Sequence, residues 1–206
     1  MEFFEIRNWF AHILCDYLRK GEESSRNLLE AAIKVIRGER VKANNLLEKL
    51  PEEVDVFCLR EGMLELDSGK VDPITEEYLR EKADKVSKFL SQLGDFEPVG
   101  EDIEKNVEMA RKLFDAGLYF EVHELLEEIW MGEFGKDRDF LQALIQIGVA
   151  YYHLDNYNRR GYFLLLENAL QLLSGYSGTV YSVDVDGLKE RIRKICQRQV
   201  DSSLRF

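Results

Sequence analysis

The sequence predicts an all-α fold, an up-and-down bundle of helical hairpins with a small β-hairpin in the N-terminal half. Apolar residues recur at intervals of three and four along most of the chain, which is the spacing of one buried helical face. Glycines separate the periodic stretches. Short connections between successive helices produce antiparallel neighbours, so we expect helical hairpins.

The sequence of the N-terminal half predicts four helices and one β-hairpin. Gly21 and Gly38 follow the first two periodic stretches, as expected of C-terminal caps, and Thr75 is the predicted cap of the long fourth helix. Two short β-like runs between the third and fourth helices predict the hairpin. The expected helices cover residues 3–18, 23–37, 41–50 and 75–93, and the expected strands cover 54–57 and 63–66.

A linker is expected where two glycines and a proline separate two helical patterns, in Gly94-Asp-Phe-Glu-Pro-Val-Gly100. The predicted organisation is therefore a helical domain of unknown role at 1–93, a linker at 94–100 and a helical bundle at 101–206. In the second half the expected helices cover residues 103–114, 119–131, 137–154, 158–173 and 186–198.

The charge balance argues against two kinds of partner. The chain has 28 basic and 39 acidic residues, a formal charge of −11. This charge repels phosphate backbones and anionic surfaces, so we expect neither nucleic acid nor a membrane as partner. No apolar run approaches the roughly 18–20 residues that cross a bilayer.

The cysteines indicate the compartment. Cys15, Cys58 and Cys196 are widely spaced and form no C-x-x-C pair, which is the pattern of buried thiols in a reducing compartment. No targeting segment is visible, and we expect a cytoplasmic protein. The charged fraction of 33% is consistent with a thermophilic source.

One segment carries most of the candidate chemistry. Four carboxylates and one imidazole crowd a few turns of helix, and His123 and Glu127, at i and i+4, share a face that continues to Trp130. Like charges at this spacing repel, so the segment needs internal partners or an external cation. Either His123 helps to fix a packed helix while Glu124 and Glu128 are solvated, or this face is a binding pocket.

A metal site is the sharper form of the pocket hypothesis. His-Glu-x-x-Glu is similar to the zinc-protease pattern His-Glu-x-x-His with its second histidine replaced. A catalytic zinc needs three protein ligands, and His153, on a different helix, is the available second imidazole. The di-iron pattern Glu-x-x-His is missing, because Phe120 stands three residues before His123. We therefore expect no metal, no cofactor and no catalytic residue.

Polar residues on the following helix are the expected partners of this segment. Gln146 and His153 share one face of an otherwise apolar helix that also carries Gln142. Such residues need hydrogen-bond partners if they are buried, so we expect a network that reaches the face of His123 and Glu127. This network is either architectural or part of a ligand site. The expected countercharges are Arg138, Arg159 and Arg160.

Four motifs in order resemble the family known as domain of unknown function 309. They are Tyr-Phe-Glu-Val-His-Glu-Leu-Leu-Glu-Glu-Ile-Trp (119–130), Phe-Leu-Gln-Ala-Leu-Ile-Gln (140–146), Ala-Tyr-Tyr-His (150–153) and Asn-Arg-Arg-Gly (158–161). The resemblance covers about residues 103–190 and implies an all-helical bundle without an established activity. The family's recurrent positions correspond here to Glu121, His123, Glu124, Glu127, Trp130, Gln142, Gln146, His153, Asn158 and Gly161. Ala143 stands where the family often has glycine. All of these recurrent positions except Gly161, together with Arg138 and Arg160, form the predicted binding set.

A second, looser resemblance is to tetratricopeptide repeats. Residues 150–157 and 166–172 resemble the helix, turn and second helix of one unit, and residues 117–121 resemble an earlier turn. The turns lie about 39 residues apart, against about 34 in the repeat family, and the loop at 132–136 accounts for the difference. Two units would form a hairpin bundle, because about three are needed for a free-standing solenoid.

Two functions compete at this point. The leading prediction is a noncatalytic binding or assembly module whose face with His123, Glu127 and His153 receives a small molecule or a protein segment. Missing catalytic motifs favour it. The alternative is a metal-assisted hydrolase in which Glu124 or Glu127 acts as general base. The sequence leaves open the ligand, self-association into a homo-oligomer and the role of residues 1–93.

Overall fold

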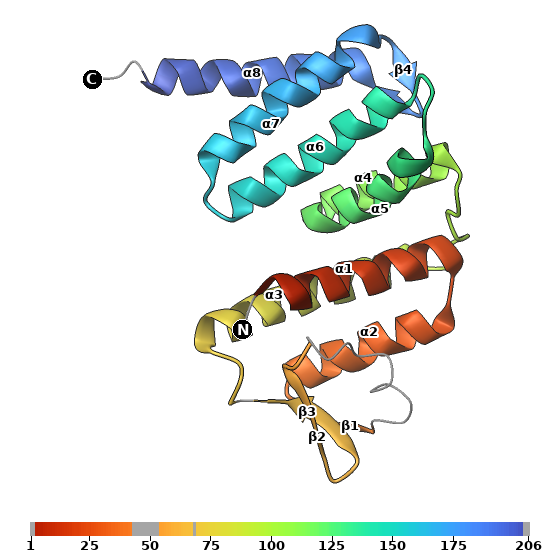
Figure 1. Cartoon of the computed structure of the whole chain (residues 1–206), viewed down its shortest axis with the longest axis vertical. Coiled ribbons are helices and arrows are strands. Elements are labelled where there is room, and N and C mark those ends of the chain that lie inside the picture. The colour runs from red at the N-terminus through yellow and green to blue at the C-terminus, as the bar shows by residue number, and fades with distance from the viewer. Residues whose placement is uncertain (1–2, 43–53, 68, 204–206) are drawn as a thin grey trace. The chain divides into compact units, whose positions relative to one another are not determined.

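The computed structural model describes residues 3–42, 54–67 and 69–203, in which eight α-helices and a few short strands occur (Figure 1). The predicted all-α class is confirmed. The chain divides into two compact units, Met1–Pro98 and Val99–Phe206. The division lies inside the stretch that was predicted as a linker.

The first unit is a three-helix array with a small sheet. It contains α1 (Phe3–Lys20), α2 (Glu23–Ile36) and α3 (Pro73–Leu93), and each helix packs on the next. Their apolar stripes supply the core, because the side chains of each stripe are removed from water together. Its largest fully buried side chains include Phe10, Leu14, Leu18, Leu28, Leu29, Ile36 and Leu79.

The glycines after α1 and α2 stand where the sequence predicts helix ends. Gly21 has φ +69°, and Gly38 has φ +89°. After α2 the N–H of Gly38 donates to the carbonyl of Val35 at 2.9 Å, and the N–H of Glu39 donates to that of Lys34 at 3.0 Å. This pair of bonds is a Schellman motif, which needs a left-handed residue and therefore favours glycine.

The sheet of the first unit has the order β1-β3-β2 and is antiparallel. The predicted hairpin is present as β2 (Phe57–Arg60) and β3 (Met63–Leu66). The second strand lies where it was predicted, but the first was placed at 54–57 and overlaps β2 only at Phe57. The predicted third helix is wrong at its start, because β1 (Val41–Lys42) pairs with β3. β-branched Val41 fits a strand as well as a helix start, and pairing with Leu64 decides between them. The rest of that predicted helix lies outside the described residues.

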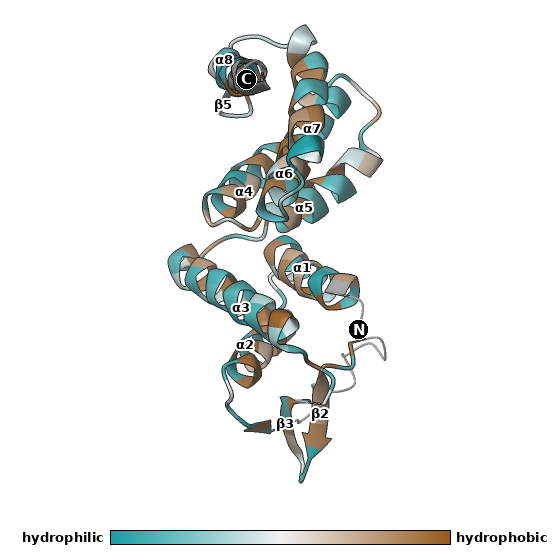
Figure 2. Cartoon of the chain, turned by 90° about the vertical axis from the view of Figure 1, so that its left-hand side faces the viewer, coloured by the Kyte–Doolittle hydropathy of each residue, from teal (hydrophilic) through white to brown (hydrophobic). Residues whose placement is uncertain are grey.

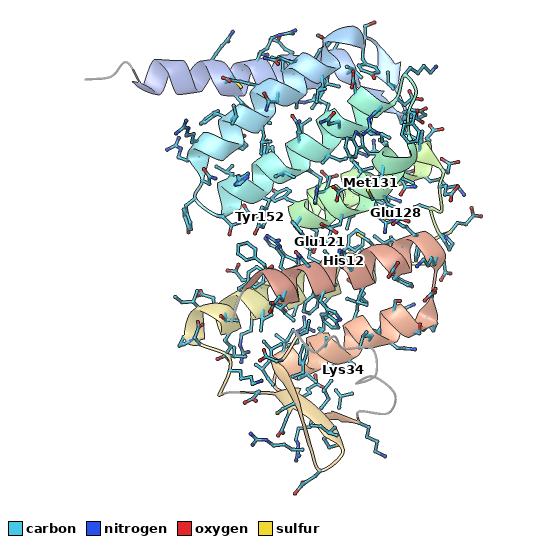
Figure 3. All side chains as sticks on the ribbon, in the orientation of Figure 1. His12, Lys34, Glu121, Glu128, Met131 and Tyr152 are labelled. Carbon is cyan, nitrogen blue, oxygen red and sulfur yellow. The ribbon has the colours of Figure 1, made fainter. Side chains whose placement is uncertain are left out.

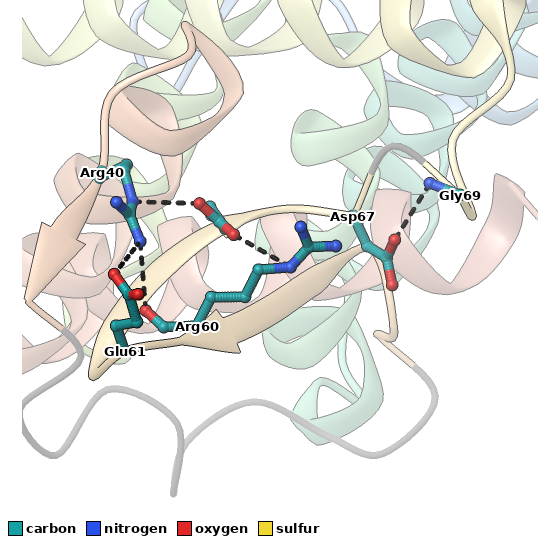
Figure 4. Close-up of polar contacts among 6 residues, drawn as sticks. Arg40, Arg60, Glu61, Asp67 and Gly69 are labelled. Carbon is teal, nitrogen blue, oxygen red and sulfur yellow. Dashed lines mark hydrogen bonds and ion pairs between the residues drawn. The ribbon is translucent and has the colours of Figure 1, made fainter.

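Charged side chains bridge the strands of this sheet (Figure 4). Glu65 on β3 accepts from the guanidinium of Arg40 at 3.1 Å and from that of Arg60 at 3.1 Å. Arg40 also lies 3.6 Å from a carboxylate oxygen of Glu61. These pairs are largely exposed, so each contributes little stability, but together they link β2, β3 and the residue just before β1.

The cap of α3 differs from the prediction. Asp72, not Thr75, is the N-cap, and its carboxylate accepts from the N–H groups of Ile74 and Thr75, each at 2.9 Å. Thr75 lies in the first turn and donates its hydroxyl to the same carboxylate at 2.9 Å. Pro73 at the first helical position explains the difference, because proline is well tolerated there.

The second unit contains five helices, of which four form two successive hairpins. They are α4 (Ile103–Asp115), α5 (Tyr119–Gly132), α6 (Arg138–Asp155), α7 (Arg159–Leu172) and α8 (Val185–Ser203). Each helix packs on the next in chain order, as the up-and-down prediction requires. α5 and α6 approach closely at Gly148, where an added Cβ would lie 2.9 Å from Val122.

One element of this unit was not predicted from the sequence. After the 3₁₀ turn η2 (Leu173–Gly175), the strands β4 (Thr179–Val180) and β5 (Val183–Asp184) form a tight hairpin. Its two turn residues, Tyr181 and Ser182, have φ +44° and +62°. Such a turn normally takes asparagine or glycine, so the sequence lacks the usual signal.

Each helix presents an apolar and a polar face, seen as brown and teal in Figure 2. In the described part of the chain, no helix combines the length and apolar character needed to cross a membrane.

Candidate functional site

The candidate site is built on α5, the second helix of the first hairpin. The turn before this helix again forms a Schellman motif, in which Gly117 has φ +70° and the N–H of Leu118 donates to the carbonyl of Leu113. Glu121 lies in the first turn of α5, where a negative charge interacts favourably with the helix dipole. Leu125 and Leu126 are fully buried and hold the helix in the bundle.

Three side chains of α5 come together in one group. His123 Nδ1 lies 3.1 Å from Glu124 Oε1, and His123 Nε2 lies 3.4 Å from Glu127 Oε2. The side chains of His123 and Glu124 are 22% and 14% exposed, and that of Glu127 is 41% exposed. The group is therefore partly sheltered at the histidine and open to solvent at Glu127.

Aromatic rings border this group. The ring of Phe120 lies 5.6 Å from that of His123 and 5.5 Å from that of Tyr152 on α6. Tyr152, labelled in Figure 3, was missed as a site residue. The signal was present, because Tyr152 belongs to the Ala-Tyr-Tyr-His motif, but sequence spacing alone does not show which α6 residue faces α5.

The two remaining carboxylates of the segment have different surroundings. Glu121 is fully buried, whereas Glu128, two turns further along α5, is exposed (Figure 3). Both have further polar contacts in the structure. Neither carboxylate belongs to the three-residue group around His123.

Arg138 and Trp130 form a structural pair at the end of α5. The guanidinium of Arg138 lies 3.9 Å from the centre of the Trp130 ring and donates to the carbonyls of Trp130 and Glu133, each at 2.7 Å. These bonds satisfy carbonyl groups that the helix end leaves open. Arg138 therefore caps α5 and is not the expected countercharge for its carboxylates.

His153 and Asn158 lock the turn between α6 and α7. The side-chain amide of Asn158 donates to His153 Nδ1 at 3.0 Å, and its carbonyl oxygen accepts from the N–H of Gly161 at 2.9 Å. Because an amide nitrogen only donates, Nδ1 accepts and the neutral ring carries its proton on Nε2. A Cβ on Gly161 would lie 2.8 Å from the Asn158 amide nitrogen, which explains the glycine.

Gln146 lies in a different place from the histidines. It lines an open polar hollow of about 750 Å³ together with Asn168 and Gln171 of α7. Its side-chain oxygen is buried and has no hydrogen bond among the described residues. Gln142 lies one turn earlier on α6 and is half-buried.

The structure thus separates the predicted binding set. His123, Glu124 and Glu127 form one group, Trp130 and Arg138 a second, and His153 and Asn158 a third. Arg159 and Arg160 are exposed at the start of α7. Among the described residues, no ion pair joins Arg138, Arg160 or His153 to a carboxylate of α5, so the expected network between the helices is wrong.

The group on α5 has the donor set of a metal site. One ligand atom from each of His123, Glu124 and Glu127 lies within 4.8 Å of the other two. Zinc bonds of about 2.0–2.2 Å place tetrahedral ligand atoms roughly 3.5 Å apart, so the group would contract by about an ångström around an ion. Imidazole with carboxylate suits zinc and its neighbours in the first transition row.

The comparison with known proteins concerns this same part of the chain. Residues 107–165 match the family model of the domain of unknown function DUF309. The resemblance predicted from the motifs is thereby confirmed for residues 107–165, a shorter stretch than the expected 103–190. No curated protein and no solved structure was found to be similar to the chain. The DUF309 segment includes the group on α5 and the lock between α6 and α7.

Proposed function

We propose that the DUF309 segment is a noncatalytic binding module in which His123, Glu124 and Glu127 hold one divalent transition-metal ion. The observation that carries this proposal is the gathering of three donor atoms within 4.8 Å on a single helix. We predicted no metal from the sequence because the zinc-protease pattern requires a second histidine, which is replaced here. Two carboxylates and one imidazole provide three ligands without it.

The surroundings of the group support binding. The ring of Phe120 packs beside that of His123, which limits the positions of the imidazole ring, and Tyr152 packs in turn on Phe120. Glu127 is the most exposed donor, so its carboxylate is accessible to an ion that enters from solvent. A divalent cation would also relieve the repulsion between carboxylates on α5, which costs a few tenths of a kcal/mol for each exposed i,i+4 pair.

A noncatalytic role fits the use of the carboxylates. Glu124 and Glu127 are the residues that a hydrolase would need as general base, but in the proposed site both would be metal donors. The remaining pattern residues, Trp130 and Arg138, are committed to ending α5. The module would therefore present a bound ion to a small anionic molecule or to a carboxylate of a partner protein.

The test is a titration of untagged full-length protein with Zn²⁺ and Co²⁺, followed by calorimetry and by the visible absorption of Co²⁺. We expect one ion per chain, and at least a tenfold loss of affinity in His123→Ala and in Glu127→Gln. Affinity should also fall as the pH is lowered, because protons compete with the ion for its ligands.

Glu167→Gln is the matched control. Glu167 lies on α7, forty positions after Glu127, and is exposed on the second hairpin. This variant removes the same charge but should bind the ion as wild type does. Folded wild-type protein that takes up no ion, or equal losses in Glu127→Gln and Glu167→Gln, would refute the proposal.

The second candidate, a metal-assisted hydrolase, is favoured by one feature of the same group. Three protein ligands leave coordination positions open, as in catalytic zinc sites. Such an enzyme would hydrolyse nitrophenyl esters or phosphates in its Zn²⁺ or Co²⁺ form and lose this activity in His123→Ala. If the protein is a noncatalytic binding module, the wild type with Zn²⁺ or Co²⁺ should show no more turnover than His123→Ala with the same ion.

A further inference from the structure

A second cavity lies in the DUF309-containing unit, on a different side of α5. Its volume is about 430 Å³, within the range of about 300–1,000 Å³ that is typical of ligand pockets. Its buried floor comes from the four helices of the two hairpins. The floor residues that matter here are Val107, Ala110, Val122, Leu126 and Ile147.

The last helix forms the other wall. Leu188, Ile192 and Ile195 of α8 line the cavity at intervals of three and four, so one face of this helix is turned toward it. α8 packs mainly on α7 and on the strands β4 and β5. Figure 2 shows α4 and α8 on the same side of the α6–α7 hairpin. The space between these two helices is therefore not filled by their own side chains.

An apolar cavity of this size favours an apolar occupant. Exposure of its lining to water is unfavourable in proportion to area, and an alkyl chain that covers the lining regains that free energy. Val122 and Leu126 face this cavity, whereas His123 and Glu127 form the proposed metal site. The two sites are thus separate, and either one can fail without the other.

The mouth of the cavity carries charge. Arg111 of α4 and Arg191 of α8 line it, and Asp115 is the one acidic side chain among the described lining residues. Both arginines are exposed, and neither has an ion pair or hydrogen bond within the described part of the chain. In a protein with a formal charge of −11, this local excess of positive charge at an apolar opening is selective for an anionic end group.

We propose that this cavity binds an elongated apolar molecule ending in a carboxylate, of the fatty-acid class. The alkyl chain lies between α4 and α8, and the carboxylate lies at the mouth with Arg111 and Arg191. Arginine is suited to this role because its guanidinium matches the geometry of a carboxylate.

The experiment is calorimetric titration of the full-length protein with dodecanoate, dodecanol and dodecylamine below their aggregation limits. We expect one dodecanoate per chain, weaker binding of dodecanol and the weakest binding of dodecylamine. Arg111→Gln and Arg191→Gln should each weaken dodecanoate about two- to fivefold, because exposed ion pairs contribute little, and leave dodecanol unchanged. The matched control is Arg193→Gln, an exposed arginine of α8 outside the cavity.

A cavity-filling variant tests the position of the alkyl chain. Ala110→Leu should reduce dodecanoate and dodecanol binding together, by about tenfold or more. Should this variant fail to fold, Leu188→Phe at the half-buried rim serves the same purpose. Absence of dodecanoate binding to folded wild type, equal binding of all three molecules, or full binding in the filled variants would each overturn the proposal.

Discussion

The two helical hairpins of the second unit make the same turn with different chemistry. In the first, Gly117 takes the left-handed position and two buried leucines, Leu113 and Leu118, flank it. In the second, Tyr157 takes that position with φ +59°, and His153 and Asn158 stand where the leucines were. Each residue lies forty positions after its counterpart. The backbone geometry is shared, because both turns have the bonds of a Schellman motif.

This difference separates architecture from function within the DUF309 pattern. In the second hairpin, His153 and Asn158 hold the turn by a hydrogen bond, as two buried leucines hold it by packing in the first. Their polar character is therefore explained without a ligand. In the first hairpin, the turn is complete without any polar side chain. His123 and Glu124 of α5 have no polar counterpart on α7, whereas Glu127 corresponds to Glu167. Phe163 and Leu164 occupy the positions of His123 and Glu124.

The largest expected effect comes from comparing how much the Leu113 contact and the His153 hydrogen bond each contribute to stability. Leu113→Ala should destabilise the second unit by about 2–5 kcal/mol, because it leaves a cavity in the core. His153→Ala should cost only about 0.5–1.5 kcal/mol, the net value of a hydrogen bond. Hydrogen exchange of the amides of α4–α7, measured by mass spectrometry, reports both. Equal losses would show that His153 is a core residue.

Substitutions at the left-handed position of the two turns should change stability in opposite directions. Gly117→Ala should destabilise the unit by about 1–2 kcal/mol, because alanine is strained there. Tyr157→Gly relieves similar strain but makes the unfolded chain more flexible, so a gain of under about 1 kcal/mol is expected. Tyr157 is 95% exposed, and no packing is lost. A loss of stability in Tyr157→Gly, measured by urea unfolding, would show that the tyrosine ring is needed.

Much of the fold could be predicted because apolar stripes and glycines determine helix faces and ends. Gly21 and Gly38 stand at helix ends as expected. The strands β4 and β5 could not be predicted, because Tyr181 and Ser182 take positive φ without being glycine or asparagine.

The candidate site was predicted only in part. Spacing on one helix is enough to bring His123 and Glu127 together. Spacing does not reveal the partner of His153, which is its neighbour Asn158 and not a side chain of α5. Partners across helices depend on how each helix is rotated about its axis, and a single sequence contains little information about that.

The smallest expected effect on stability concerns the two hydrogen bonds that attach the hairpin β4–β5 to the two helical hairpins. At α4, Ser182 donates to Glu104 at 3.1 Å, and beside α6, Tyr181 donates to Asp137 at 2.8 Å. Burial, and then this hydrogen bond, raise the pKa of Tyr181 to about 12 from its usual value of 10. The serine bond has no titratable donor in this range.

The second attachment should therefore weaken in alkali while the first does not. Since the pKa of Tyr181 is higher in the folded state, its contribution to stability is complete below pH 10 and is lost as the pH rises toward 12. Loss of the proton also places a phenolate beside Asp137. Tyr181→Phe should remove this part of the pH dependence, whereas Ser182→Ala should lower stability equally at all pH values. Urea unfolding between pH 8 and pH 11 measures both slopes, and the same alkaline slope in Tyr181→Phe as in wild type would assign it to other tyrosines, such as Tyr162, whose pKa burial also raises.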